Sequence, residues 1–233
     1  MNFRIGATVL LLDEKNSLQS YGFEHQRLLG SIEEVLKFLE KYQVDEIHCI
    51  FPIKGDPICS LKAFMALSKI PISTPISIGG GISSKNISQI LQNPFFERLI
   101  FNRSLFNNDG AIEKASSLMG RQAMVGSLPF VIVNNILKLY NSSLNKFEEV
   151  TDKFWKKLDT ILNEIILLDA RAEGNKQGFD FSALKFIDFP LSRVIISGGI
   201  IDADIKQAKK LGLAGVSIDN SVLHKEYSIK ELR

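Results

Sequence analysis

The stretch PISIGGGISSKNISQIL, residues 75–91, decides the fold because the chain contains it twice. The second copy, RVIISGGIIDADIKQAK, spans residues 193–209, half a chain length further on. Each copy joins a short apolar run to a segment of helical periodicity through a glycine-rich turn. A second matching pair follows them, LIFNRSLF (residues 99–106) and VSIDNSVL (residues 216–223). The repeat predicts two similar halves, about residues 1–120 and 121–233.

Short apolar runs alternate with longer helical segments along the whole chain, which is typical of parallel strands joined by helical crossovers. Strands are predicted at residues 5–12, 46–51, 76–78, 98–101, 122–127, 164–168, 193–197 and 215–218. Helices are predicted at residues 32–42 behind a Ser31 and Glu34 capping box, and at 57–68, 84–91, 109–119, 152–162, 181–187, 202–211 and 228–232. Eight such pairs predict one domain, residues 1–233, folded as a single (β/α)8 TIM barrel with a two-fold half-barrel repeat. A doubly wound open sheet fits eight units less well.

Two stretches break this alternation, and both follow predicted strands. Residues 19–30 are expected to be irregular. Residues 128–146, LPFVIVNNILKLYNSSLNK, consist of two apolar runs on either side of an Asn-Asn pair. This second stretch predicts a β-hairpin on the loop face of the barrel.

Composition excludes several classes of protein. The 28 basic and 26 acidic residues give a net charge of +2 and are spread along the chain, so a nucleic-acid partner is not expected. No apolar run reaches the roughly 18–20 residues of a membrane span, and the N-terminus lacks signal-peptide features, which predicts a cytoplasmic protein without membrane contact. Cys49 and Cys59 have no metal-site spacing and are expected to be reduced thiols. No metal or other cofactor is expected.

The two glycine-rich turns are candidate phosphate sites. Glycine lets the backbone approach a ligand closely, and the following helix directs free N–H groups at an anion. The alternative is that the glycines only end a barrel strand, but two spaced copies favour a substrate with a phosphate at each end. The candidate contacts are Gly80, Gly81, Asn102 and Arg103 in the first half, and Gly174, Ser197, Gly198, Gly199 and Asn220 in the second.

Eight short motifs, spread nearly end to end, resemble the histidine-biosynthesis barrels. The nearest resemblance is to the cyclase subunit of imidazole glycerol phosphate synthase, and a more distant one is to the phosphoribosylformimino isomerase. The motifs are VDEI (44–47), GGGI (79–82), RLIFN (98–102), GRQAMV (120–125), EIILL (164–168), GNKQGFD (174–180), SGGI (197–200) and SVLH (221–224).

The resemblance implies two catalytic aspartates, at the ends of strands 1 and 5, and neither is present. The strand 1 position holds Leu11, or Leu10 with a shift of one residue, and the strand 5 position holds Pro129. These side chains cannot transfer a proton, so ring closure by the family's acid–base pair is not expected. Other departures from the family pattern are Gln19, Phe51 and Ala172, together with Asp219, whose carboxylate would repel a phosphate at the second turn.

The resemblance also implies a ring of charged residues at the N-terminal ends of strands 1, 2, 4 and 6, which gates ammonia delivered by a glutaminase partner. Arg4, Glu46, Arg98 and Glu164 occupy these positions. A plain salt-bridge ring that closes the barrel is the alternative.

Asp169, Glu173 and Lys176 follow strand 6 on the face where TIM barrels hold their active sites, and they are the candidate catalytic residues. A solvated loop is the alternative. Structural roles are predicted for the three histidines, His25, His48 and His224. Lys54 and Asp56 either contact substrate or form the turn before a helix.

The pattern favours the synthase-like half of a two-protein glutamine amidotransferase that binds a phosphorylated small molecule. It resembles the branch that supplies ammonia for amidino groups in bacterial surface-sugar and lipopolysaccharide synthesis. One alternative is a genuine cyclase or isomerase of histidine biosynthesis. Another is a catalytically inactive barrel that acts as a binding or scaffold subunit.

Overall fold

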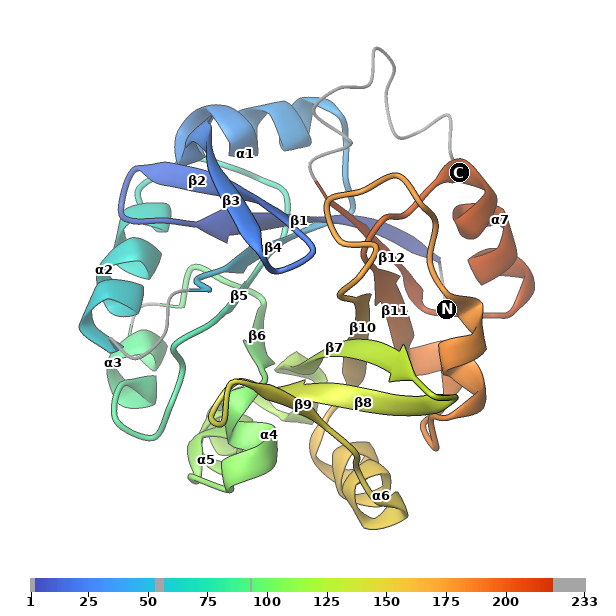
Figure 1. Cartoon of the computed structure of the whole chain (residues 1–233). Coiled ribbons are helices and arrows are strands. Elements are labelled where there is room, and N and C mark those ends of the chain that lie inside the picture. The colour runs from blue at the N-terminus through green and yellow to red at the C-terminus, as the bar shows by residue number, and fades with distance from the viewer. Residues whose placement is uncertain (1–2, 53–56, 93, 220–233) are drawn as a thin grey trace.

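Eight parallel strands form a closed barrel in the computed structural model, which describes residues 3–52, 57–92 and 94–219 (Figure 1). Each strand pairs with its neighbours in chain order, and the last strand pairs with the first, Arg4 lying beside Gly215. The barrel strands are β1 (Arg4–Leu11), β4 (Glu46–Ile50), β5 (Ile76–Gly79), β6 (Arg98–Phe101), β7 (Met124–Val133), β10 (Glu164–Asp169), β11 (Val194–Ser197) and β12 (Gly215–Ile218). The predicted TIM barrel is confirmed.

Seven α-helices surround the barrel in the described part of the chain (Figure 1). They are α1 (Ile32–Lys41), α2 (Pro57–Leu67), α3 (Ile87–Leu91), α4 (Arg103–Asn107), α5 (Ala111–Met119), α6 (Asp152–Ile161) and α7 (Asp202–Lys210). Ser31 caps α1 as predicted, since its side chain accepts the Glu34 N–H at 3.2 Å. Among the described residues, no helix combines the length and the apolar character that a membrane span needs.

One helix prediction needs correction, one helix was not predicted, and one prediction cannot be compared. Residues 181–187 were predicted to be α-helical but form a 3-10 helix, Phe181–Lys185, in which Asp180 caps the Ser182 N–H; a segment this short suits the tighter turn of a connector. The short helix α4 was not predicted. The predicted helix at residues 228–232 lies outside the described residues.

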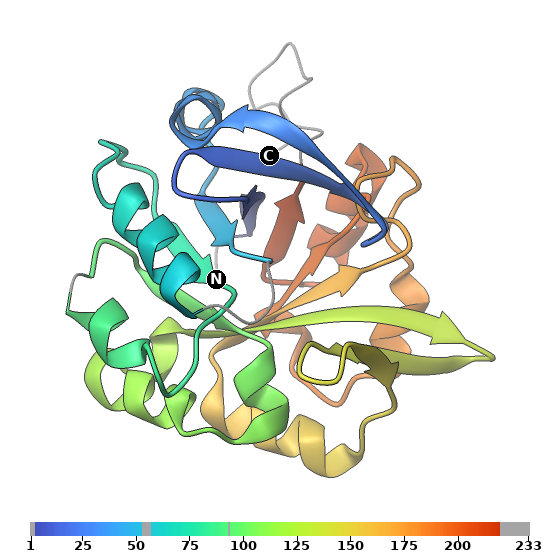
Figure 2. The same ribbon diagram turned by 60° about the vertical axis from the view of Figure 1, so that its left-hand side comes forward.

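Two hairpins extend from the same end of the barrel (Figure 2). The predicted hairpin is confirmed: β7 continues into β8 (Ile136–Asn141) through Asn134 and Asn135, which both have positive φ, and β9 (Lys146–Glu148) follows. The prediction of an irregular stretch at residues 19–30 is wrong, because β2 (Asn16–Tyr21) and β3 (His25–Ser31) pair there in antiparallel fashion.

The tip of the first hairpin reaches β8 across the mouth of the barrel. The ring of Phe23, between β2 and β3, lies 5.9 Å from that of Tyr140 on β8. The first hairpin follows β1 and the second follows β7, and these strands are opposite each other in the ring of eight. The contact therefore bridges the C-terminal end of the barrel.

Side chains alternate between the two faces of each barrel strand and build two separate cores. The outer core lies under the helices and contains Val9 and Leu11 of β1 and Ile47 and Cys49 of β4. The inner core lies within the barrel and consists of Ile100, Val125, Ile166, Ile195 and Ala214, with Ile50 packed against it.

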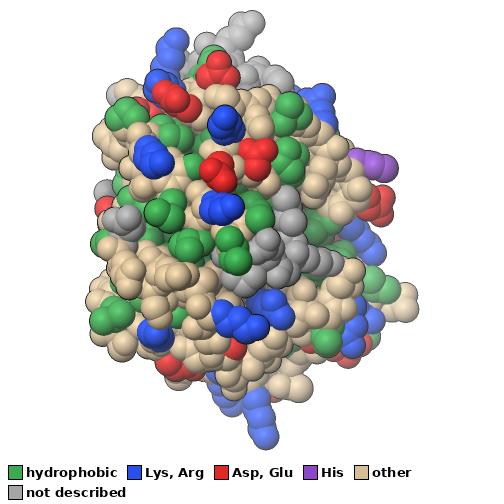
Figure 3. Space-filling model, turned by 90° about the vertical axis from the view of Figure 1, so that its left-hand side faces the viewer, with side chains coloured by type: hydrophobic (Ala, Val, Ile, Leu, Met, Phe, Trp, Pro, Cys, Tyr) green, Lys and Arg blue, Asp and Glu red, His purple; other side chains and the backbone are tan. Residues whose placement is uncertain are grey.

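The outer surface of α2 carries apolar side chains. Ile58 is 65% exposed and Met65 is also exposed. On this side of the molecule apolar and charged side chains are interspersed (Figure 3).

Candidate functional site

The two glycine-rich turns have matching backbone conformations at the C-terminal ends of β5 and β11. Gly80 and Gly81 have φ of 85° and 66°, and Gly198 and Gly199 have φ of 92° and 68°. A Cβ atom on Gly80 would lie 1.9 Å from the carbonyl oxygen of Phe51, and one on Gly198 would lie 2.4 Å from that of Asp169. Close contact with the end of the preceding strand therefore requires glycine at both turns.

The two turns differ in the side chain that stabilises each. Asn86 accepts the Ser83 N–H at 3.0 Å and donates to the Gly81 carbonyl at 2.9 Å. At the equivalent place in the second turn, Asp204 accepts the Ile201 N–H at 3.0 Å. The first turn is thus held by a neutral amide and the second by a carboxylate, which makes the first turn the more favourable for an anion.

The other predicted phosphate contacts are arranged differently in the two halves. The Asn102 amide donates to the carbonyls of Ser127 and Tyr140 at 2.9 and 3.0 Å, so this side chain holds the β7–β8 hairpin. Arg103 is exposed at the start of α4. In the second half Asp219 accepts the Gly174 N–H at 3.1 Å, and the Ser197 hydroxyl donates to the Ser217 carbonyl. Asn220 lies outside the described residues.

The inner face of the barrel is apolar at the positions where the resemblance implies catalytic aspartates. Leu11 packs in the outer core, whereas Leu10 faces the interior, so the shift of one residue gives the side chain that lines the barrel. Pro129 follows the same alternation as Val125 of the inner core and pairs with Leu168 of β10. General acid–base chemistry at this end must therefore come from the loops.

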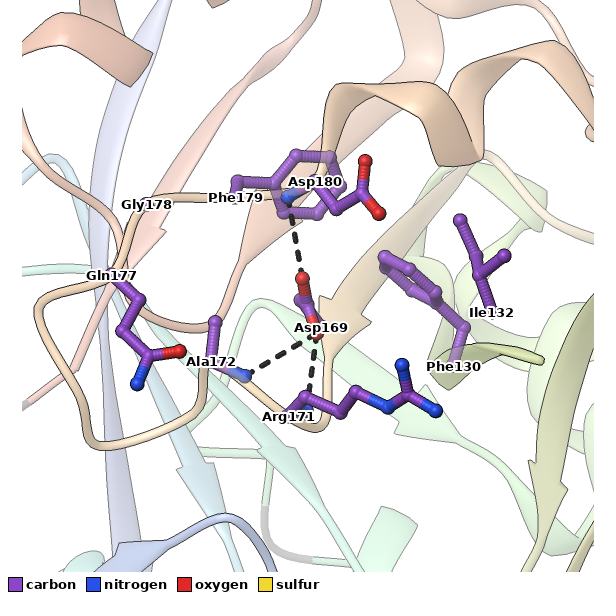
Figure 4. Close-up of a pocket in the computed structure, with 9 residues that line it drawn as sticks. All are labelled: Phe130, Ile132, Asp169, Arg171, Ala172, Gln177, Gly178, Phe179 and Asp180. Atoms are coloured by element: carbon purple, nitrogen blue, oxygen red, sulfur yellow. Dashed lines mark hydrogen bonds between the residues drawn. The ribbon is translucent and has the colours of Figure 1, made fainter. Parts of the chain in front are cut away.

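A pocket of about 290 Å³ opens beside β10 at this end of the barrel (Figure 4). Asp169 lies at its floor and accepts three backbone N–H bonds, from Arg171 at 3.1 Å, Ala172 at 3.3 Å and Asp180 at 3.2 Å. Burial raises the pKa of the Asp169 carboxyl, although these bonds act against the rise. The other lining residues are Phe130, Ile132, Gln177, Gly178 and Phe179. Asp169 thus holds the loop that carries the other candidate catalytic residues.

Glu173 fastens that loop to the first hairpin. Its carboxylate accepts the Ser20 hydroxyl at 3.1 Å and the Phe23 N–H at 3.2 Å, and its carbonyl accepts the Gly22 N–H at 2.9 Å. Burial raises the pKa of Glu173, and the negative charge of Asp219 raises it further. Lys176 is exposed on the same loop. Of the three candidates, Asp169 and Glu173 are buried carboxyls, and each has a second carboxylate nearby, Asp180 and Asp219 respectively.

At the opposite end of the barrel, the structure brings the four predicted ring residues together. Arg98 Nε donates to Glu46 Oε1 at 2.8 Å, and its other guanidinium nitrogens bind Glu46 and Glu164. Arg4 binds both oxygens of Glu164 at 2.5 Å, and its Nη1 lies 3.8 Å from Glu46 Oε2. Both carboxylates are buried. We call these four residues the charged ring.

The charges in the ring stabilise one another despite their burial. Burial alone would raise the pKa of Glu46, but the positive charges of His48 and Arg98 outweigh it and hold the pKa well below its usual range. The pKa of Arg98 is raised in turn by Glu46 and Glu164 against the effect of burial. Glu46 and Arg98 are therefore ionised at neutral pH.

The charged ring lies at the floor of a second pocket, of about 570 Å³, on the N-terminal face. The residues around Arg4, Glu46 and Arg98 are Asp45, Pro75, Phe96, Glu97, Met119, Gln122 and Ala123. This end thus presents a concave surface that combines the charged ring with apolar side chains, such as Phe96 and Met119, and with polar ones, such as Asp45 and Glu97.

The remaining predicted residues lie away from both pockets or outside the described residues. His25 is exposed at the start of β3. Cys49 is buried in the outer core, where burial raises its pKa to about 12, and Cys59 is exposed. Lys54, Asp56 and His224 lie outside the described residues.

Comparison with known proteins identifies the family. The family model described as "Histidine biosynthesis protein" matches residues 6–228. The chain belongs to this family. The predicted membership in the histidine-biosynthesis barrels is therefore confirmed.

Among its histidine-biosynthesis relatives the chain resembles both branches. A phosphoribosyl imidazole-4-carboxamide isomerase of Clostridium botulinum (strain Okra / Type B1) is 28% identical over 86% of this chain and 82% of its own length. A protein of Vibrio vulnificus (strain YJ016), named for the hisF2 subunit of imidazole glycerol phosphate synthase, is 25% identical over 91% of this chain and 80% of its own. The HisF subunit of that synthase from Chlorobium chlorochromatii (strain CaD3) is 24% identical over 93% and 88%. Identity does not separate the isomerase branch from the synthase branch.

Proposed function

We propose that this chain is the synthase-like half of a two-protein glutamine amidotransferase. It receives ammonia at the N-terminal end of the barrel and joins it to a phosphorylated small molecule at the C-terminal end. The observation that carries the proposal is the charged ring at the floor of the N-terminal pocket. The similarity to two proteins named as synthase subunits supports it.

The chemistry of the charged ring favours a gate that can open over a permanent salt-bridge closure of the barrel end. Removing charges from water carries a large penalty, and apolar residues would close a barrel end at least as stably. Ion pairs can exchange partners, however, so two acids and two bases can part and re-form around a small polar molecule. The apolar side chains Phe96 and Met119 beside the ring give a partner protein a surface to bury.

At the C-terminal end Glu173 is the best-placed general acid or base. Its raised pKa keeps a fraction of the carboxyl protonated closer to neutral pH than an exposed glutamate would be. Asp219 contacts the backbone of the next residue, Gly174, so the two carboxyls share one region of the mouth. The phosphate binds at the Gly80 turn, because the second turn carries the carboxylates of Asp204 and Asp219.

A surface-sugar substrate, in an amidino-forming pathway, fits this chemistry better than the substrate of imidazole ring closure. The inner face carries Leu10 and Pro129 where an acid–base pair is needed for ring closure. A substrate that only accepts ammonia at an activated carbon needs one proton-transfer group, and Glu173 supplies it.

The experiment that tests the proposal is glutamine hydrolysis by a glutaminase-like protein with and without this chain. We expect a stable complex and stimulated hydrolysis. Glu97→Lys, at the rim of the N-terminal pocket, is expected to weaken the complex, whereas the matched variant Glu24→Lys, on the hairpin at the other end, leaves it unchanged. Absence of both a complex and stimulation would refute the proposal and favour a scaffold role.

A genuine isomerase or cyclase of histidine biosynthesis is the second candidate, favoured by the 28% identity to an isomerase. In that case Asp169, at the floor of the C-terminal pocket, is the residue available for proton transfer. Growth of isomerase-deficient or cyclase-deficient bacteria that express this chain would support this function. Loss of that growth in Asp169→Asn would assign the residue.

A further inference from the structure

His48 lies inside the barrel directly above the charged ring. It follows Glu46 by two residues on β4, so both side chains face the interior, and it is 2% exposed. Its Nε2 lies 3.4 Å from Glu46 Oε2 and makes no hydrogen bond to any described residue. Its Nδ1 lies 2.9 Å from the hydroxyl of Ser217, which lies 2.8 Å from that of Thr8. A continuous polar chain therefore runs from the ring into the barrel.

The absence of a side chain at Gly6 leaves space for the imidazole of His48. A Cβ atom on Gly6 would lie 3.1 Å from Cε1 of His48 and 3.1 Å from the carbonyl oxygen of Glu46. The opposite side of the interior is filled by the apolar inner core. An aliphatic side chain at position 48 would extend that core, whereas histidine places a buried ring nitrogen beside the Glu46 carboxylate without a hydrogen bond to any described residue, which is unfavourable unless the nitrogen has a role.

The charged groups that face His48 all belong to the charged ring. Glu46 on its own strand is the nearest ionised group, and Arg98 on β6, Glu164 on β10 and Arg4 on β1 complete the charges that face it. Ser77 on β5 donates to Glu46, and the hydroxyls on β1 and β12 are neutral. The two acids and two bases of the ring balance, so a proton on His48 leaves the group with one net positive charge.

We propose that His48 is a titratable positioning residue of the charged ring, which holds Glu46 against Arg98 when it carries a proton and releases that hold when it is neutral. In the protonated state Nε2 faces the carboxylate as a charged donor, and Nδ1 donates to Ser217, which donates to Thr8. In the neutral state one of these donors is lost. The ring is then held by its arginines and by the hydroxyl of Ser77, which donates to Glu46.

This inference rests on the proposed function in one respect only, namely that ammonia is the molecule that passes through the charged ring. With His48 protonated, the extra positive charge opposes ammonium and other cations. With His48 neutral, the loosened ring admits neutral ammonia, which can hydrogen-bond to the hydroxyls of Ser217 and Thr8 beyond it.

Hydrogen exchange of arginine Nε–H groups, followed by NMR across the pH range in which His48 titrates, measures the hold directly. Arg98 Nε donates to Glu46 and reports on the ring. Arg193 Nε donates to the Asn163 carbonyl at 2.5 Å and is the internal control for the pH dependence of exchange. We expect the protection of Arg98 relative to Arg193 to fall about tenfold, equivalent to one pKa unit of coupling, with the midpoint at which the imidazole signals of His48 titrate.

Two variants separate titration from packing. His48→Gln keeps an N–H donor at the reach of Nε2 but cannot titrate, so the protection ratio is expected to stay high and flat. His48→Leu removes the donor and is expected to give a low, flat ratio; if it does not fold, the wild-type and His48→Gln profiles decide. A flat ratio in the wild type while His48 titrates, or an unchanged slope in His48→Gln, would overturn the inference. The measurement uses no partner, so a negative glutaminase assay leaves it unaffected, and a flat ratio leaves the glutaminase proposal standing.

Discussion

The two ends of this barrel differ in where their charged side chains lie. At the N-terminal end, four charged side chains enter the interior and pair there, with Glu46 and Glu164 almost fully buried. At the C-terminal end the inward positions at Leu10 and Pro129 are apolar, and the charged groups are Asp169, the last residue of β10, and residues of the loops. Barrel stability alone would favour the reverse, because the mouth is wetter than the interior. Under the proposed function, the charged end admits ammonia, and the other end lacks the acid–base pair that the family resemblance implies.

Replacing Arg98 with methionine is the most severe way to break the N-terminal end. Arg98 binds both buried carboxylates, so its removal leaves Glu46 and Glu164 with Arg4 as the remaining cation of the ring. We expect the free energy of unfolding, measured with urea, to fall by about 3–5 kcal/mol. Arg103→Met, an exposed arginine at the other end, is the matched control and is expected to change it by less than about 0.5 kcal/mol. Equal effects of the two variants would show that the ring contributes nothing to stability.

Replacing Gly80 with alanine perturbs the C-terminal end by the next largest amount. The new Cβ would overlap the Phe51 carbonyl and force a side chain into a positive φ, which together cost roughly 2–3 kcal/mol. Gly212→Ala is the control, because Gly212 also has positive φ but a Cβ atom added there would meet open space within 4 Å. Thermal unfolding of the two variants separates overlap from backbone strain. If Gly212→Ala is as destabilised as Gly80→Ala, the contact with Phe51 is not what requires glycine.

Glu46 and Glu173 are buried carboxyls at opposite ends of the barrel. Their contributions to the free energy of unfolding are expected to depend on pH in opposite directions. The pKa of Glu46 is lowered in the folded chain, so its stabilisation is present above the unfolded value, about 4.3, and is lost as the pH falls toward the folded value. The pKa of Glu173 is raised, so its contribution is fully present below the unfolded value and is lost as the pH rises through the folded value.

Urea unfolding of Glu46→Gln and Glu173→Gln at several pH values measures both contributions. The stability advantage of the wild type over Glu46→Gln should shrink between about pH 5 and about pH 2. Its advantage over Glu173→Gln should shrink as the pH rises from about 4 toward neutral. Parallel profiles for the two variants would contradict the difference between the ends.

The sequence predicts the barrel well because every strand buries one apolar face under a helix, and that requirement appears directly as short apolar runs. The hairpin of β2 and β3 escapes prediction for the opposite reason. Its buried strand contains Ser17, Gln19 and Ser20, polar residues that hydrogen-bond to β3 or to Glu173 and leave no alternating apolar pattern. Tertiary contacts, not local periodicity, make that segment a strand.

The candidate site divides in a similar way. The matching glycine turns follow from the repeat, and the composition of the ring follows from the family resemblance. The role of Asn102 does not, because its amide binds the β7–β8 hairpin, whose position depends on a remote segment. The inward orientation of His48 can be predicted from the sequence, since strand alternation puts it on the same face as Glu46. Its contact with Ser217 of β12 cannot, because that contact depends on closure of the barrel.

The smallest expected effect sharpens the contrast between the two glycine turns. Asp219 holds the Gly174 N–H that a phosphate at the second turn would approach, so Asp219→Asn removes a repelling charge while keeping a hydrogen-bond acceptor. We expect inorganic phosphate to bind at this turn about two- to fivefold more tightly, corresponding to roughly 0.3–1 kcal/mol. The shift of the Gly174 amide signal during a phosphate titration measures the affinity. Glu33→Gln, which removes an exposed charge on α1, controls for net charge, and an equal gain in that variant would mean that the long-range field, not the contact of Asp219 with Gly174, weakens the second turn.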